Sequence, residues 1–226
     1  MEKLLKENHG FSLLEILIAM VLMVAILGLS LNASFSSKDT LDKEVSGLER
    51  ALRFMNDEAV LKNKVVRLHL QLDKNPQEYS VEYGPSDSFI LPSQSETETV
   101  VTDLEEDKAK KKEINDTNLK FNKIIEFQDS NSILNDSIKI IGVAKSTDKK
   151  IYVNGDISIY AFPTGEREDS LLLIASDEDV VSLKINGFSN KIKKENYPLE
   201  KNSELELEAK YELKSKEIFE KWQKEK

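Results

Sequence analysis

Apolar residues dominate one long stretch near the start of the chain. Residues 11–31 read FSLLEILIAMVLMVAILGLSL, an apolar run with a single ionisable side chain. About 20 apolar residues are enough for a helix to cross the hydrocarbon core of a bilayer. The pattern therefore predicts a transmembrane segment at 11–31.

The apolar positions that follow this run are spaced three and four residues apart. This spacing places them on one face of a helix, and they are Leu41, Val45, Leu48, Leu52, Met55 and Ala59. We expect the span to continue into an amphipathic stalk helix at 32–62, giving a bent rod of about 75 Å at 1.5 Å per residue. No proline interrupts residues 11–62. The apolar stripe is expected to pack on a globular head.

Alternation of apolar and polar residues replaces the helical spacing after residue 62. Residues 65–72 read VVRLHLQL and residues 79–83 read YSVEY, which predicts a β-hairpin with a turn at 73–76. Further strands are expected at 137–143, 151–162, 170–175 and 180–185, with turns at 154–155, 163–165 and 186–187. The predicted fold class is α+β: a long amino-terminal helix packed on a small antiparallel sheet head at 63–200.

Two segments lack this pattern. The first, at 93–118, is rich in Ser, Thr, Glu, Asp and Lys; such a composition buries too little apolar surface to offset its ordering entropy, so we expect a mobile insertion in the head. The second is the charged tail at 201–226. Its Glu–Lys pairs at a spacing of four favour a solvated helix, and they are Glu206–Lys210, Glu212–Lys216, Glu217–Lys221 and Glu220–Lys224.

The sequence of the tail is also compatible with a β-strand. Leu205, Leu207, Ala209, Tyr211 and Leu213 alternate with polar residues, which is the pattern of a half-buried strand. In either case we expect three apolar side chains of the tail to be buried against another surface, those of Ile218, Phe219 and Trp222. We expect them to dock on the same molecule, with docking on another subunit as the alternative.

Composition excludes several classes of function. The formal net charge is -9, and phosphate binding needs a surplus of Lys and Arg, so no nucleic-acid partner is predicted. Cysteine is absent, which removes disulfides, thiolate metal sites and Cys nucleophiles. Of the two histidines, His69 is expected on the polar face of its strand, solvated or hydrogen-bonded. No P-loop, HExxH or dinucleotide-binding pattern occurs, so no catalytic residue and no cofactor are assigned.

Two acidic runs in the sequence are candidate calcium-binding sites. The acidic runs at 103–107 and 177–179 offer carboxylates, yet neither has the spacing and turn glycine of an EF-hand. A charge run is usually a solvated face. No metal site is assigned.

Glu15 is the one ionisable residue in the apolar run. A carboxylate at the middle of a membrane helix costs about 2.5 to 3.5 kcal/mol, so such residues usually have a partner or a purpose. The run Gly10-Phe11-Ser12-Leu13-Leu14-Glu15 resembles the processing site of type IV prepilins and type II secretion pseudopilins. In that family a prepilin peptidase cuts after the glycine and methylates the new amino terminus.

The resemblance implies a prepilin leader peptide at 1–10, with processing between Gly10 and Phe11 and methylation of Phe11. His9 would leave with the leader. Glu15 would act in assembly by neutralising the amino terminus of a neighbouring subunit, since such a pair is strong in low dielectric and either charge alone is penalised.

The order of the segments in the head resembles that of one subtype within this family. VVRL after the helix, and later FPTG, LLLIAS and VVSLKINGFSNKI, look like the minor pseudopilin of the H type and the related minor pilin of type IV pili. This implies a structural, non-enzymatic subunit of a type II secretion system. It would be a single-pass protein of the inner membrane with its head in the periplasm, and its partners would be prepilin peptidase and other pseudopilins or pilins of a filament.

Three alternatives stay open. The chain could be a minor pilin of a type IV pilus or DNA-uptake machine. It could also be a periplasmic binding or enzymatic domain on a plain membrane anchor. A secretory signal peptide cut after Ala33 is the third, although residues 11–31 are too long for its apolar region.

Overall fold

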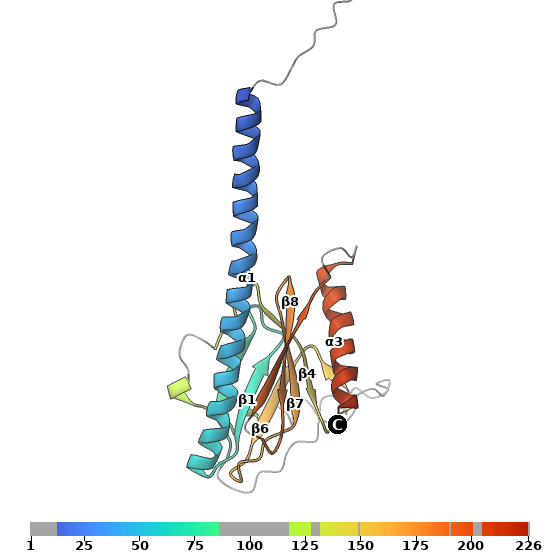
Figure 1. Ribbon diagram of the computed structural model, residues 1–226. Helices are drawn as coiled ribbons and strands as arrows, with labels where there is room; N and C mark the ends of the chain where they lie inside the picture. The colour runs from blue at the N-terminus through green and yellow to red at the C-terminus, as the bar shows by residue number, and fades with distance from the viewer. Residues whose placement is uncertain are drawn as a thin grey trace, which may run out of the picture.

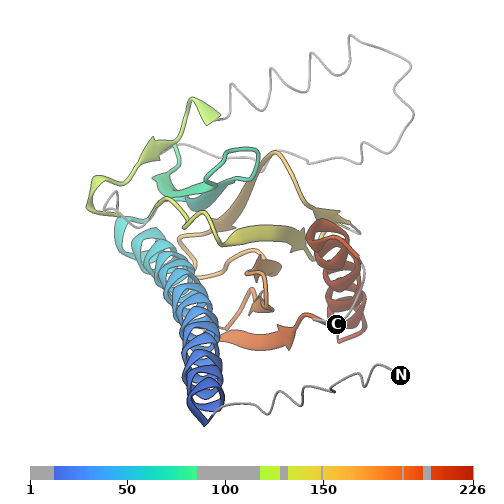
Figure 2. The same ribbon diagram turned by 90° about the horizontal axis from the view of Figure 1, so that it is seen from above.

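The computed structural model describes residues 13–85, 118–127, 132–148, 150–189, 191–200 and 205–225, and only the backbone of residues 25–36 and 126. A long helix runs down one side of a β-rich head, and a shorter helix covers the opposite side (Figure 1). Seen from above, the β-structure lies between the two helices (Figure 2). The predicted α+β class, a long helix packed on antiparallel sheets, is confirmed.

The long helix, α1, is continuous from Leu13 to Lys62, 50 residues, or about 75 Å at 1.5 Å per residue. It ends at Asn63, whose φ of 52° is left-handed, and the next amide, that of Lys64, donates to the carbonyl of Ala59 (3.2 Å). This is the usual way in which a helix is stopped without glycine.

The two halves of α1 meet different surroundings. The upper half stands clear of the head in Figure 1. The lower half packs on the head, and all six residues of the predicted apolar stripe are buried there. The stripe is therefore a core-packing surface, as expected from its helical spacing.

The head contains two antiparallel sheets where a single sheet was predicted. The first has the order β3-β2-β1-β6, with β1 at Val66–Gln71, β2 at Glu78–Tyr83, β3 at Asn122–Lys123 and β6 at Asp156–Ala161. The second has the order β5-β4-β7-β8-β9, with β4 at Lys139–Lys145, β5 at Ile151–Tyr152, β7 at Ser170–Ala175, β8 at Asp179–Ile185 and β9 at Ile192–Pro198. A short 3-10 helix, η1, spans Ile125–Phe127.

The predicted hairpin is β1 and β2, which pair from Val66 with Tyr83 to Gln71 with Glu78. The strand predicted at 151–162 is two strands, separated at the turn that was predicted at 154–155. Gly155 adopts a φ of 85°, a conformation that favours glycine and turns the chain. As a result β5 pairs with β4 in the second sheet, while β6 pairs with β1 in the first.

Two hydrophobic clusters hold these layers together. The larger one joins α1 to apolar residues of both sheets, among them Leu48, Leu68 and Leu172. The smaller one lies on the other face of the second sheet, where Leu171 and Leu173 of β7 meet the carboxyl-terminal helix. Both faces of the second sheet are therefore covered, and every residue of β7 is buried.

The carboxyl-terminal helix, α3, spans Leu207–Lys224, so the helix prediction is confirmed and the strand alternative is wrong. Ile218, Phe219 and Trp222 are buried against the second sheet, which confirms docking on the same molecule. Of the predicted charge pairs, Lys216 and Glu212 meet at 2.6 Å. Lys221 contacts Glu195 of β9 (3.5 Å) instead, because α3 lies on the sheet and is not fully solvated.

Most of the insertion predicted at 93–118 lies outside the described residues, and its mobility stays a prediction. Asn118 is described: its side-chain oxygen accepts a hydrogen bond from Arg67 (2.7 Å).

Candidate assembly site on the amino-terminal helix

Residues 13–24 of α1 present apolar side chains in every direction. Over residues 13–24 the large apolar residues are all exposed, from Ile18 at 49% to Leu13 at 82%. Consecutive residues of a helix point to different sides, so no face of this segment is covered by the head. An exposed apolar surface of this extent usually marks a site of contact with a membrane or with another protein.

Glu15 lies in the first turn of α1 and is exposed. The next charged residue along the helix is Lys38. Anything that covers the apolar side chains around Glu15 therefore also desolvates its carboxylate, which costs several kcal/mol per ion unless a cation accompanies it. The segment suits a partner that brings a positive charge to the level of Glu15.

The predicted processing residues, Gly10 and Phe11, lie outside the described residues. Of the predicted span at 11–31, residues 13–24 are described in full and residues 25–31 by their backbone. In the part of the chain that the structure describes, no helix meets the length and apolarity needed to cross a membrane.

Comparison with known proteins bears on this segment directly. Residues 5–31 match the family described as prokaryotic N-terminal methylation motif. The chain carries this methylation motif. The match includes the predicted cleavage point and Glu15, and the motif runs into a helix that packs on antiparallel sheets. Together these features bear out the resemblance to type IV pilin-like pseudopilins.

No curated protein matches the chain in sequence. Among solved structures, the minor pseudopilin EpsH from the type 2 secretion system of Vibrio cholerae is similar over 69% of this chain and 94% of that chain, with 10% identity and a TM-score of 0.35.

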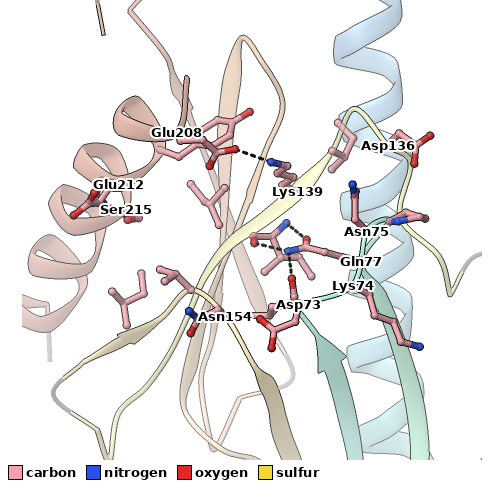
Figure 3. A pocket seen from close by; sticks show the side chains of 18 of the residues that line it. Asp73, Lys74, Asn75, Gln77, Asp136, Lys139, Asn154, Glu208, Glu212 and Ser215 are labelled. Atoms are coloured by element: carbon pink, nitrogen blue, oxygen red, sulfur yellow. Dashed lines mark hydrogen bonds and ion pairs between the residues drawn. The ribbon is translucent and has the colours of Figure 1, made fainter. Parts of the chain in front are cut away.

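The head has a hollow of about 710 Å³ between α3, β4 and the β1–β2 turn (Figure 3). Gln77, from that turn, reaches across it: its Oε1 accepts from the backbone N–H of Ile140 (2.6 Å), and its Nε2 donates to the carbonyls of Ile140 (3.2 Å) and Leu72 (3.1 Å). The amide thus replaces a neighbouring strand at this point of β4. Its role is to join the two sheets, and the sequence pattern alone did not single it out.

A second polar cluster lies on the face of the first sheet that points away from α1. Arg67 donates from Nε and Nη2 to Glu82 Oε2 (2.9 and 2.7 Å), and its guanidinium lies over the ring of Phe121 (3.9 Å). Arg67 and Glu82 are both buried. A buried ion pair with this geometry is a structural element that becomes costly when only one partner is removed.

His69 belongs to the same face and is also buried, so the expectation of a solvated polar face is wrong. Its Nδ1 lies 3.0 Å from Ser158 Oγ, which is the hydrogen-bonded alternative. Burial, followed by the charge of Arg67, lowers the pKa of His69, so the imidazole is neutral near pH 7. A neutral imidazole that forms a hydrogen bond with a serine of the neighbouring strand has a structural role.

The two acidic runs offer carboxylates as candidate calcium ligands. Residues 103–107 lie outside the described part. At 177–179, Asp177 accepts from Ser37 (2.7 Å) and Asp179 lies 3.9 Å from Lys38 Nζ. No group of three His, Cys, Asp or Glu side chains suited to a metal occurs within the described ranges.

Proposed function

We propose that this chain is a structural minor pseudopilin of a type II secretion system, most like the H type. It would be processed by prepilin peptidase and assembled into a short periplasmic pseudopilus. The observation that carries the proposal is the methylation motif at 5–31. This motif overlaps the start of a helix that exposes apolar side chains at residues 13–24 and buries an apolar stripe in the head from Leu41 to Ala59.

Maturation would free an ammonium group at Phe11, four residues before Glu15. In a helical assembly, a neighbouring copy shifted along the axis would place its amine beside Glu15. Two desolvated charges attract strongly when paired and are penalised when alone, so the pair would select one register of packing.

The subunit would wait in the inner membrane as a single-pass protein with its head in the periplasm. The exposed apolar side chains of residues 13–24 support this placement, because lipid and the helices of a filament are interchangeable apolar surroundings for them. Transfer from membrane to filament would therefore leave their burial unchanged while adding the Glu15 contact.

The role of Glu15 can be tested in a host that has a type II secretion system. Full-length wild-type, Glu15→Ala and Glu15→Asp chains are compared for processing and for their presence in filaments that are cross-linked in intact cells and then extracted from the membrane fraction. Glu15→Ala should be processed normally and be depleted from filaments, and Glu15→Asp should recover part of the incorporation. If Glu15→Ala enters filaments as well as the wild type does, Glu15 has no part in assembly.

Loss of the gene distinguishes the subtype. A secretion pseudopilin should be required for protein export and dispensable for a type IV pilus. The opposite result would identify a minor pilin.

A further inference from the structure

The sequence contains two Asn–Gly pairs, and each lies in a turn of the head. They are Asn154–Gly155, between β5 and β6, and Asn186–Gly187, between β8 and β9. Both asparagines are exposed. An exposed Asn–Gly pair is chemically labile, because a glycine has no side chain to keep its backbone nitrogen away from the carboxamide of the preceding asparagine.

The reaction open to such a pair is a cyclisation without oxidation or reduction. The glycine nitrogen attacks Cγ of the asparagine, the bond from Cγ to the carboxamide nitrogen breaks, and ammonia leaves with the proton that the glycine nitrogen gives up. Water then opens the resulting succinimide at either carbonyl, which yields aspartate or isoaspartate. The nitrogen must first approach Cγ to about 3 to 3.5 Å in the right orientation, so contacts that fix the Asn–Gly peptide oppose the attack.

Gly155 is held on both of its backbone polar atoms. Its N–H donates to Asp73 Oδ1 (2.8 Å), and its carbonyl accepts from the N–H of Leu72 (3.0 Å). Asp73 and Asn154 lie at the same border of the hollow beside α3 (Figure 3). The bond to Asp73 is charge-assisted, which makes it stronger than a bond between neutral groups. The glycine nitrogen has to give up this bond before it can attack Asn154.

Gly187 is held by the same pair of contacts. Its N–H donates to Asp169 Oδ1 (2.6 Å), and its carbonyl accepts from the N–H of Arg167 (3.0 Å). Here the asparagine is held as well, since Asn186 Oδ1 accepts from the N–H of Phe188 (3.0 Å) and the Asn186 carbonyl accepts from Arg167 Nε (3.0 Å). This second pair therefore has restraints on its carboxamide in addition to those on its glycine.

We propose that Asn154 is a latent site of succinimide and isoaspartate formation, and that Asp73 keeps it unreactive in the folded chain. Gly155 is half-buried, whereas Gly187 is buried, so the Asn154 pair is the easier of the two to release. The proposal is independent of the assignment to a secretion system.

The place of this turn gives the reaction a structural consequence. Residues 153–155 carry the chain from β5 in the second sheet to β6 in the first. Isoaspartate routes the backbone through the β-carbon and so lengthens the chain at this crossing. The change would move Gly155 away from Leu72 and Asp73, beside the hollow where Gln77 joins the two sheets. Conversion of Asn154 should therefore loosen the junction between the sheets.

Ageing of the folded, full-length chain in detergent at mildly alkaline pH tests the role of Asp73. Wild type and Asp73→Ala are incubated and digested, and the amide and acid forms of the two Asn–Gly peptides are quantified by mass spectrometry. Loss of one charge-assisted hydrogen bond should speed the conversion of Asn154 by about tenfold, with aspartate and isoaspartate as products. Asn186, in the same digest, should keep its wild-type rate and is the internal control.

Two further samples set the limits. Wild type unfolded in urea should convert both sites faster than the folded chain does. Asp73→Asn keeps an oxygen acceptor of the same shape without the charge, so its rate at Asn154 should lie between those of wild type and Asp73→Ala.

Three results would overturn the proposal: conversion of Asn154 in folded wild type as fast as in urea, an Asn154 rate in Asp73→Ala that is no higher than in wild type, or equal acceleration at Asn186 in both Asp73 variants.

Discussion

Replacing Trp222 with alanine should release α3 from the head without unfolding the head. Trp222 is 5% exposed and packs with Phe219 at a ring-centroid distance of 6.2 Å in the smaller cluster. Truncating a buried Trp to Ala costs about 3 to 5 kcal/mol. A charged helix of this length is marginal when isolated, so its order depends on docking, and the loss should appear locally.

Hydrogen exchange of the full chain in detergent measures this. At about 1.4 kcal/mol per factor of ten, amides of α3 should exchange at least a hundredfold faster in Trp222→Ala, while those of α1 around Leu48 keep their rates. The matched control is Leu213→Ala, on the same helix but 59% exposed, which should stay within about 0.5 kcal/mol of the wild type. Equal rates in the two variants would refute the reasoning, and so would faster exchange throughout the head.

Two further predictions concern the polar face of the first sheet. Glu82→Gln leaves the Arg67 guanidinium buried without its carboxylate and should lower the free energy of unfolding by about 3 to 5 kcal/mol. The control Lys216→Ala removes an exposed ion pair and should change the free energy of unfolding by less than about 1 kcal/mol. Equal losses of stability for the two variants in urea titrations would contradict the prediction for Glu82→Gln. Because the folded-state pKa of His69 lies below its ordinary 6.5, the unfolded chain binds the proton first, so the free energy of unfolding should fall as the pH drops below 6.5 and level off above it. His69→Gln should flatten this dependence between pH 5.5 and 7.5, and an unchanged slope would exclude His69 as its source.

Strands with a strong local pattern were predictable from the sequence. β7 is a continuous apolar run between turns and was predicted with its observed bounds, 170–175. α1 was predictable because its apolar stripe keeps helical spacing up to Ala59. In both, burial and local pattern agree, so neighbouring residues carried enough information.

Features set by distant contacts were not predictable in this way. β9 was missed because it is a partly exposed edge strand, rich in Lys and Glu, whose pairing with β8 decides its conformation. The division into two sheets depends on which strands pair across the chain, and the alternation of one strand does not specify that. The hydrogen bond of His69 depends on Ser158, which lies 89 residues further along the chain. The candidate assembly residue, Glu15, could be identified because it is the one ionisable side chain in the apolar run at 11–31, whereas the sequence of one chain does not specify what its carboxylate would contact in an assembly.

Mass spectrometry of the amino terminus tests the central claim most directly. The full-length chain is expressed with a prepilin peptidase, recovered from membranes and analysed at its first residue, with Gly10→Leu as the uncleavable control. The account predicts a mature chain that begins with N-methylated Phe11. A chain that keeps its first ten residues, or one cut after Ala33, would contradict it.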